Sequence, residues 1–231
     1  MIAITIFLLL GFIYTLIKLM VIWIDLDEVL AELAETVLKE NNYTIWWKKI
    51  KFEDITDYYI YNIDGIDVNV SEAMELFRKT LANDIERLNI KPIKWVYDKL
   101  LEWKNKWYKL KVITARPKEL FEKYTLDWLE KHYPWIFDEI YFANNDPKII
   151  ADNWQDQTRK WIMCKNLWVD IMIEDNPNYA YDVASCGIKT FLLEKPWNKN
   201  SQNQYRLFWG RYQDSVPWSC PYRLCWPEAQ I

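Results

Sequence analysis

The chain has 231 residues, of which 51% are hydrophobic and 27% are charged, and its formal net charge is −4. This length suits one α/β domain with an insertion, and the composition supplies a core of ordinary size. The negative net charge argues against a surface that coats nucleic acid, so we expect no nucleic-acid polymer as a partner.

Cysteine usage indicates a reducing compartment. The four cysteines lack the spacing of a zinc site, and the single His132 cannot complete a Cys/His ligand set. Cys220 and Cys225 could pair, but a loose C-terminal tail is the setting that fits them better. We therefore expect free thiols and a cytoplasmic location.

The N-terminus is apolar and leaves two interpretations open. Residues 2–17 are almost continuously apolar, and Lys18 ends the run. The run is shorter than the roughly 20 residues of an ordinary spanning helix, and no signal-peptide pattern is visible. Either residues 1–19 anchor the protein in a membrane, with the domain in the cytoplasm, or Met20 is the true start.

An acidic pair follows the first predicted strand. Residues 21–24 form a short apolar, β-branched run typical of a buried parallel strand, and Asp25 and Asp27 come after it. Residues i and i+2 of an extended segment point the same way, so both carboxylates can converge at the carboxyl edge of a sheet. Their repulsion requires a nearby cation or proton. The alternative is an N-cap aspartate with a solvated neighbour, before a helix expected over residues 28–41.

A mostly helical segment separates this strand from the next. Helices are predicted over residues 70–81, 83–88 and 92–101, and the next clear strand begins at Leu110. This separation exceeds one crossover helix. We interpret residues 30–90 as a small helical cap, inserted over the carboxyl edge of the sheet.

Strands and helices then alternate regularly. The predicted strands are 110–114, 139–142, 170–174 and 189–193, and the predicted helices are 118–132, 158–166 and 178–185. The alternation predicts an α/β fold with a doubly wound parallel sheet. The predicted division is an apolar segment 1–19, a core of 20–29 and 91–198, the cap 30–90, and a C-terminal extension 199–231.

Tryptophan stands where backbone geometry favours glycine. The chain has 15 Trp and only 4 Gly. Trp107, Trp135 and Trp168 lie in turns that lead into predicted strands, where a left-handed residue, usually glycine, is common. We hypothesise that some of these codons encode glycine in the source organism, for example through a reassigned UGA stop codon. The candidates are Trp23, Trp107, Trp135, Trp161 and Trp168, whereas Trp128 and Trp197 fit as genuine tryptophans. The alternative is a tryptophan-rich protein with unusual junctions.

Candidate phosphate ligands follow the second strand and begin a later helix. Thr114, Ala115 and Arg116 offer a hydroxyl and free backbone N–H groups at a strand-to-helix turn, which suit a phosphate. Lys160 lies near the start of a helix and can neutralise a phosphoryl oxygen. Taken alone, such a threonine is more often a turn residue, and such a lysine is more often solvated.

Further acidic residues point to a metal. Glu174 and Asp175 follow a later strand and bring negative charge to the edge that carries Asp25 and Asp27. Four carboxylates that converge without compensation are costly. A hard dication such as Mg²⁺, which prefers oxygen ligands, resolves this conflict.

Taken in order, these motifs resemble those of the haloacid dehalogenase (HAD) superfamily of phosphohydrolases. They are DLDEV at 25–29, ITAR at 113–116, Lys160, and IEDNP at 173–177, and the resemblance covers about residues 20–195. The spacing before ITAR, the IEDNP form and PWN at 196–198 are most similar to the deoxyribonucleotidase-like group, which includes the cytosolic type C 5′-nucleotidases. Glu28 departs from the pattern, since many members have glycine there. Trp23, Trp161 and Trp168 replace residues that are usually small.

The resemblance implies a Rossmann-like, Mg²⁺-dependent phosphatase. Asp25 would attack phosphorus and form an aspartyl-phosphate, and Asp27 would act first as general acid and then as general base. The metal would be held by the Asp25 carboxylate, the Asp27 backbone carbonyl and Asp175. Glu174 would support these ligands or replace one of them.

The expected substrate is a small phosphate monoester, with a nucleoside monophosphate favoured. Thr114 and Lys160 would hold the phosphoryl oxygens, with Lys165 as the alternative to Lys160. Aromatic residues of the cap could stack on a base or simply pack on the core; they are Trp46, Trp47, Tyr58, Tyr59 and Tyr61. The alternatives are a HAD phosphatase of another small phosphometabolite, and a non-catalytic or membrane-tethered binding module.

Overall fold

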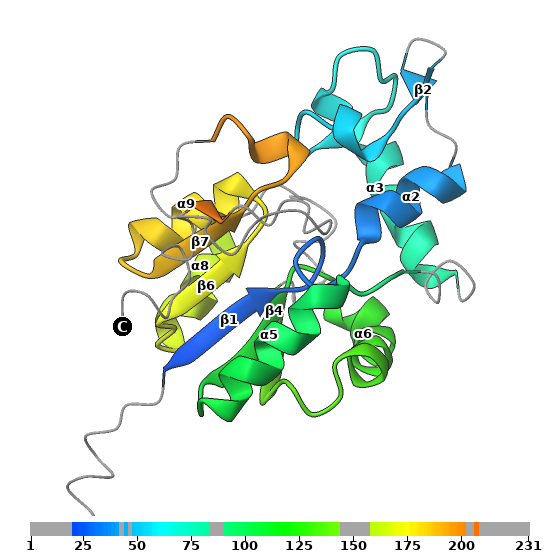
Figure 1. The fold of residues 1–231 in the computed structure, drawn as a ribbon. Coiled ribbons are helices and arrows are strands. Elements are labelled where there is room, and N and C mark those ends of the chain that lie inside the picture. The colour runs from blue at the N-terminus through cyan, green and yellow to red at the C-terminus, as the bar shows by residue number, and fades with distance from the viewer. Residues whose placement is uncertain are drawn as a thin grey trace, which may run out of the picture.

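The computed structural model describes residues 20–41, 44–45, 48–83, 90–143, 158–201 and 206–207. Within them, six parallel strands form one sheet in the order β5-β4-β1-β6-β7-β8, with β1 in the middle (Figure 1). The strands are β1 (Val21–Asp25), β4 (Lys109–Thr114), β5 (Glu139–Phe142), β6 (Ile171–Glu174), β7 (Lys189–Leu193) and β8 (Arg206–Leu207). The chain moves outward from β1 through β4 to β5 and then returns to the other side of β1, so the predicted doubly wound sheet is confirmed.

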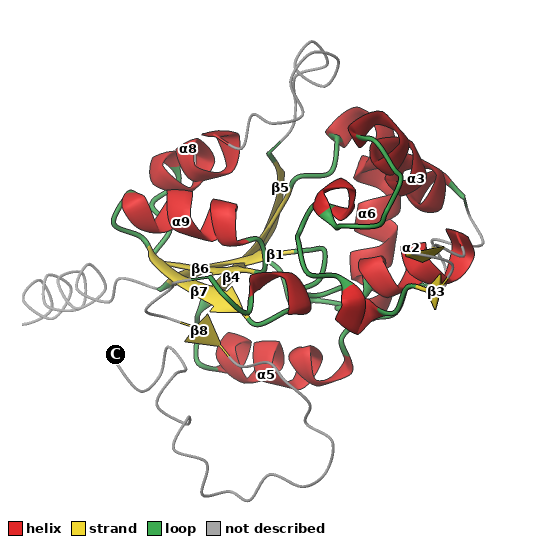
Figure 2. Ribbon diagram, turned by 90° about the horizontal axis from the view of Figure 1, so that it is seen from above, coloured by secondary structure: helices red, strands yellow, loops and turns green. Residues whose placement is uncertain are grey.

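Helices cover both faces of the sheet. They are α5 (Lys94–Asn105), α6 (Lys118–His132), α8 (Thr158–Asn166) and α9 (Pro177–Ser185). Side chains alternate along β1, so Ile22 and Ile24 join the core formed with α5 and α6, while Trp23 joins the core formed with α8 and α9. Figure 2 shows α5 on one side of the sheet and α8 and α9 on the other.

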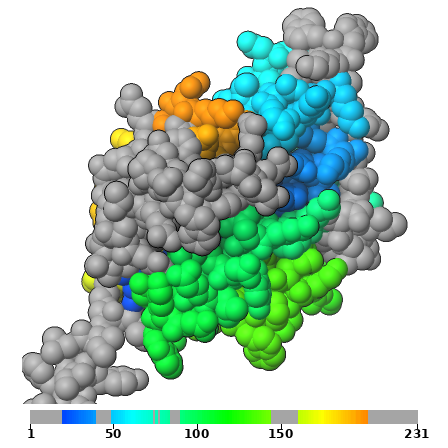
Figure 3. Space-filling view, viewed as in Figure 1, coloured from blue at the N-terminus to red at the C-terminus, as the bar shows by residue number. Residues whose placement is uncertain are grey.

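The segment after β1 is less purely helical than predicted. It contains α2 (Leu33–Asn41), α3 (Val70–Ala82), the 3₁₀ turns η1 (Phe52–Asp54) and η2 (Ile60–Asn62), and an antiparallel pair, β2 (Thr44–Ile45) with β3 (Lys48–Lys49). Phe52 packs edge-on against Trp197 of the 3₁₀ turn η3 (Pro196–Asn198), with ring centroids 5.5 Å apart. In Figure 3 the cyan surface of the segment adjoins the orange surface that follows β7.

The helix expected from residue 28 begins at Leu33, so that boundary was wrong. Glu28 has φ 61°, a left-handed conformation that a helix cannot include. The Glu28 N–H donates to the Ala31 carbonyl at 2.8 Å, which closes a tight turn. The Glu28 carboxylate accepts hydrogen bonds from the Ala34 N–H at 2.6 Å and from Lys195 at 3.3 Å. This residue therefore connects the start of α2 with the chain that follows β7.

Three of the suspected tryptophans have the backbone conformation of glycine. Among the described residues with positive φ are Trp107 (66°), Trp135 (63°) and Trp168 (53°), and their side chains are 79%, 85% and 82% exposed. They precede β4, β5 and β6, and Gly187 (φ 81°) occupies the equivalent position before β7. Trp107 and Trp168 end α5 and α8 with the paired backbone hydrogen bonds of a Schellman motif, whose left-handed residue is usually glycine.

Indole hydrogen bonds distinguish the two tryptophans that we interpret as genuine from Trp23, which is a suspect. The Trp128 N–H donates to the Ile90 carbonyl at 3.0 Å, and the Trp197 N–H donates to the Asp175 carbonyl at 3.3 Å. The Trp23 N–H is buried in β1 with no hydrogen-bond partner in the described part of the chain. Neither Trp23 nor Trp161 has a positive φ, so the backbone argument applies to three of the five candidates.

Several predictions from the sequence fall outside the described residues. They concern residues 1–19, Trp46, Trp47, Cys220, Cys225 and nearly all of the predicted helix 83–88. In the portion of the chain that is described, no helix has the length and apolarity needed to cross a membrane.

Asp138 joins three elements at the amino edge of the sheet and makes stability depend on pH. Its carboxylate accepts hydrogen bonds from Lys104 of α5 at 2.8 Å and from the Leu110 N–H of β4 at 2.9 Å. Burial opposes ionisation, but these hydrogen bonds and the nearby lysines lower the pKa of Asp138 below its ordinary value of 3.8. A depressed pKa stabilises the fold above about pH 4, and this contribution disappears as the pH falls through the folded-state pKa.

We therefore expect Asp138→Asn to lower the free energy of unfolding at pH 7 by about 1 kcal/mol, with partial exposure limiting the effect. The loss should shrink as the pH is lowered from 7 through the folded-state pKa, as measured by urea unfolding across that range. Asp127→Asn on α6 removes an exposed ion pair to Lys123 and serves as the control, with a change within about 0.5 kcal/mol. A deficit for Asp138→Asn that persists at low pH would contradict this account.

Candidate active site

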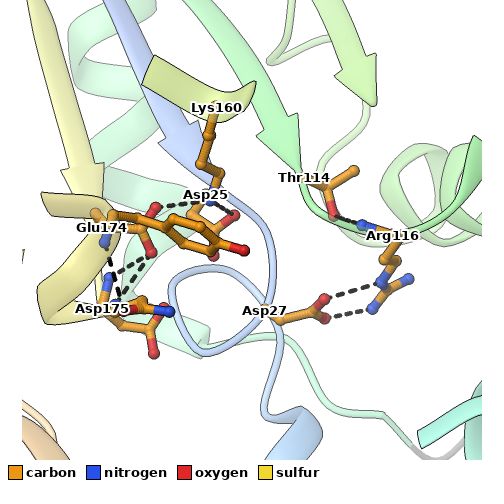
Figure 4. A network of polar contacts seen from close by, with 9 residues as sticks. Asp25, Asp27, Thr114, Arg116, Lys160, Glu174 and Asp175 are labelled. Atoms are coloured by element: carbon orange, nitrogen blue, oxygen red, sulfur yellow. Dashed lines mark hydrogen bonds and ion pairs between the residues drawn. The ribbon is translucent and has the colours of Figure 1, made fainter. Parts of the chain in front are cut away.

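The carboxyl edge of the sheet brings the predicted residues together. Asp25 ends β1, Thr114 ends β4 and Glu174 ends β6. β1 pairs in parallel with both neighbours, with Asp25 opposite Ile113 and Ile24 opposite Ile173. Their last residues therefore point to one rim, where Figure 4 shows Asp25 and Glu174 beside Lys160 and Thr114 beside Arg116.

Lys160 connects the acidic residues at this rim. Its Nζ lies 2.7 Å from an oxygen of Asp25 and 2.6 Å from an oxygen of Glu174. All three side chains are buried, and the Tyr179 ring packs over the ammonium, with its centroid 4.8 Å from Nζ. The alternative, Lys165, is exposed one turn later on α8. The helix thus directs Lys160, rather than Lys165, toward the strand ends.

The charges at this rim shift the pKa values strongly. Burial and the charge of Glu174 raise the pKa of Asp25 to about 8, although Lys160 opposes the shift. Burial and the charges of Glu174 and Asp25 raise the pKa of Asp175 well above its ordinary value. Burial alone would lower the pKa of Lys160, but Asp25 and Glu174 outweigh it and raise that pKa. Protein cations alone therefore leave negative charge at the rim uncompensated.

The rim has the donor set of a hard divalent cation. Carboxylate oxygens of Asp25, Glu174 and Asp175 lie within 4.8 Å of one another, and this is the candidate metal group among the described residues. Glu174 already accepts hydrogen bonds from Lys160 and from the N–H groups of Asp175 and Asn176. One oxygen of Asp175 is buried and has no hydrogen-bond partner in the described chain. An uncompensated carboxylate oxygen beside two others fits Mg²⁺, with Glu174 better suited to supporting the ligands than to replacing one.

Asp27 lies apart from this group. Its carboxylate is not among the three that converge, because it turns toward Arg116 on the other side of the loop after β1 (Figure 4). We expected the carboxylates of Asp25 and Asp27 to converge, but in the structure the Asp27 carboxylate points toward Arg116 instead. The positive φ of Glu28 bends the chain directly after Asp27, a turn that an extended i, i+2 argument does not include.

Of the predicted phosphate ligands at the end of β4 and just after it, Thr114 keeps a donor available for a phosphate, whereas the Arg116 side chain is paired with Asp27. The Thr114 hydroxyl oxygen accepts a hydrogen bond from the Arg116 N–H at 3.1 Å, which leaves its own proton available to a ligand. Ala115 and Arg116 line the adjoining cavity. The Arg116 guanidinium pairs with Asp27 rather than with Asp25.

A cavity of about 220 Å³ opens in front of this rim. Its lining includes the charged side chains of Asp27, Arg116 and Asp175, and the segment between β1 and α5 contributes mostly apolar side chains. Of the five aromatic residues predicted to contact a base, Tyr58, Tyr59 and Tyr61 line this cavity. The rings of Tyr59 and Tyr61 stack with centroids 5.3 Å apart.

Sequence reasoning missed several residues that organise the site. Tyr179 covers Lys160, Thr125 contacts Arg116, and Lys195 pairs with Glu28. Asn198 fixes the turn after β6, because its amide donates to the carbonyls of Asp175 and Leu193. Only the PWN motif gave a signal for this last contact.

Comparisons with solved structures identify the fold. A predicted phosphatase from Clostridium acetobutylicum is 15% identical, with a TM-score of 0.57 over 81% of this chain and 93% of that chain. Protein Tyrosine Kinase A from Mycobacterium tuberculosis is 12% identical, with a TM-score of 0.58 over 87% and 92%. No protein-family model and no curated protein matches the chain. At these identities the likeness shows the fold alone, which is the Rossmann-like α/β fold implied by the resemblance to HAD phosphohydrolases.

Proposed function

We propose that this protein is a Mg²⁺-dependent phosphomonoesterase that acts through an aspartyl-phosphate at Asp25, with nucleoside monophosphates as its substrates. The observation that carries the proposal is the buried Asp25–Lys160–Glu174 network, with Asp175 beside it at the carboxyl edge of the sheet. A structural ion pair does not require a third buried carboxylate beside a lysine that already pairs with two, and strongly shifted pKa values are typical of catalytic sites.

In the first step, an oxygen of Asp25 attacks phosphorus, and the bond from phosphorus to the leaving oxygen breaks. Asp27 donates a proton to that leaving oxygen, so the product is an alcohol. Lys160 favours the ionised form of Asp25 through its 2.7 Å contact and lies beside the carboxylate that receives the phosphoryl group. The Thr114 hydroxyl donates to another phosphoryl oxygen. When bound, Mg²⁺ would supply positive charge that reduces repulsion between the carboxylate and the phosphate dianion.

In the second step, a water molecule attacks the aspartyl-phosphate. Asp27, now ionised, takes the proton from this water, and the bond from phosphorus to Asp25 breaks. Inorganic phosphate leaves, and both aspartates return to their starting states. Asp25, the Asp27 backbone carbonyl and Asp175 would hold the metal throughout the cycle.

The cavity supports the proposed substrate class. Its volume of about 220 Å³ suits a single small leaving group and lies below the roughly 300–1,000 Å³ of drug-sized ligand sites. Tyr58, Tyr59 and Tyr61 line this cavity and offer ring faces and edges to a leaving group. Stacking on a nucleobase uses such rings without requiring a particular base.

Phosphate release from a panel of monoesters tests this proposal. The panel contains the common nucleoside 5′-monophosphates, several sugar phosphates and p-nitrophenyl phosphate, each with excess Mg²⁺ and with EDTA. We expect release that EDTA abolishes and added Mg²⁺ restores, with the highest kcat/KM for nucleoside monophosphates. A preference for sugar phosphates would overturn the substrate class alone. Release that resists EDTA would overturn the metal dependence, and no release from any ester would overturn the enzyme.

A further inference from the structure

We infer that Arg116 is a positioning residue for the acid/base carboxylate of Asp27 and that Thr125 holds Arg116 in place. This inference rests on the proposed function, because it assigns Asp27 a proton to transfer. It differs from the prediction made from the sequence, in which Arg116 binds the phosphate directly.

The contact between Arg116 and Asp27 has two-point geometry. Arg116 Nε donates to one carboxylate oxygen at 3.0 Å, and Nη2 donates to the other at 2.5 Å. Two parallel hydrogen bonds between planar groups fix both the distance and the plane of the carboxylate. The Arg116 side chain is only 4% exposed, whereas that of Asp27 is 26% exposed and lines the cavity. Asp27 is therefore held from the protein side and open on the side where a substrate enters.

A third hydrogen bond anchors the guanidinium itself. Arg116 Nη1 donates to the hydroxyl of Thr125 at 3.2 Å, and Thr125 is fully buried in α6. The backbone N–H of Arg116 also donates to the hydroxyl of Thr114. The arginine is thus fixed at both ends, from the loop after β4 and from a helix that packs on the sheet.

Asp27 needs this support because its own backbone provides little. It lies in the loop after β1, between the strand end and the left-handed Glu28. A carboxylate in such a loop can adopt several rotamers, and general acid catalysis requires it within hydrogen-bond distance of the leaving oxygen. The same guanidinium supplies positive charge beside Asp27. A lysine at position 116 would supply the charge but not the two-point geometry.

The dependence of kcat/KM on the leaving group distinguishes positioning from phosphate binding. An alkyl phosphate needs a proton on its leaving oxygen, whereas p-nitrophenyl phosphate leaves well without one. With Mg²⁺ present, we expect Arg116→Met to reduce kcat/KM about 100-fold for the alkyl ester and less than about 5-fold for the nitrophenyl ester. Asp27→Asn should show the same pattern, and Lys160→Met should reduce both values equally. Lys123→Met, an exposed cation on α6, should change neither.

Thr125→Val provides a second test with almost unchanged side-chain shape. It removes only the hydrogen bond to Nη1, and we expect a selective loss of about 5-fold for the alkyl ester. If thermal melting shows that Arg116→Met does not fold, Thr125→Val and Arg116→Lys decide the question by the same comparison. Equal losses with both esters, or no loss in Thr125→Val, would overturn the inference. An inactive wild-type protein would instead overturn the proposed function, so the two failures are distinguishable.

Discussion

Replacing Asp25 with asparagine is expected to reduce kcat by about 10⁴-fold or more, because the amide cannot attack phosphorus. Turnover of p-nitrophenyl phosphate with excess Mg²⁺ measures this loss. Asp98→Asn, an exposed aspartate of α5, is the matched control and should retain wild-type turnover. If Asp25→Asn turns over within about 10-fold of the wild type, Asp25 is removed from the mechanism.

The same substitution should leave the fold intact. Burial and Glu174 raise the pKa of Asp25 to about 8, so stability without a bound cation falls as the pH rises from about 4 toward 8. Asparagine removes this loss, and Lys160 keeps Glu174 as its partner. We therefore expect the variant to melt at pH 7.5 in EDTA no lower than the wild type. A large fall in Tm would mean that lost activity reports unfolding rather than chemistry.

Replacing Trp107, Trp135 and Trp168 together with glycine is expected to stabilise the protein. A side chain with a Cβ costs about 1–2 kcal/mol in the left-handed region, and part of the gain is offset by the freedom of glycine in the unfolded chain. We expect a net gain of about 1 kcal/mol at each position, or about 3 kcal/mol for the triple variant. For a chain of this size, that raises Tm by roughly 6–12 °C, measurable by scanning calorimetry.

A triple alanine variant separates backbone strain from surface effects. Alanine removes the same exposed indoles but keeps the Cβ, so it should gain little. If alanine and glycine stabilise equally, the cause is the loss of exposed indole rather than φ. Trp128→Gly is the opposite control, since it removes a buried side chain and its hydrogen bond to Ile90, and it should destabilise the fold by about 3–5 kcal/mol.

The decoding hypothesis has its own test in the gene. UGG codons at the five suspect positions would end it, whereas UGA at Trp107, Trp135 and Trp168, with UGG at Trp128 and Trp197, would support it. The calorimetry and the codons are independent. The strain exists in the chain as written, whatever its origin.

Much of the core could be predicted because its sequence pattern is local. Helices 118–132 and 158–166 and strands 139–142 and 189–193 have the predicted bounds, since short β-branched runs alternate with longer amphipathic ones. The start of α2 and the β2–β3 pair could not be predicted. The start of α2 depends on the turn at Glu28, and nothing in the side chain of Glu28 indicates that its φ is positive.

The candidate site shows the same division. That Asp25, Lys160, Glu174 and Asp175 meet follows from parallel strands ending at one edge, which the sequence already implies. That Asp27 turns to Arg116 does not follow, because side-chain direction in a loop depends on contacts distant in the chain. The two partners are 89 positions apart, and no local pattern connects them.

The left-handed turns before β4, β5, β6 and β7 all lie at the sheet edge opposite the carboxylates. A laboratory host that inserts bulky residues at three of them would therefore yield material that melts early yet keeps its reactive groups in place. Poor yield or aggregation of recombinant protein would then reflect how the gene was recoded, and a synthetic gene with glycine at these sites is the better starting material for crystallisation and kinetics.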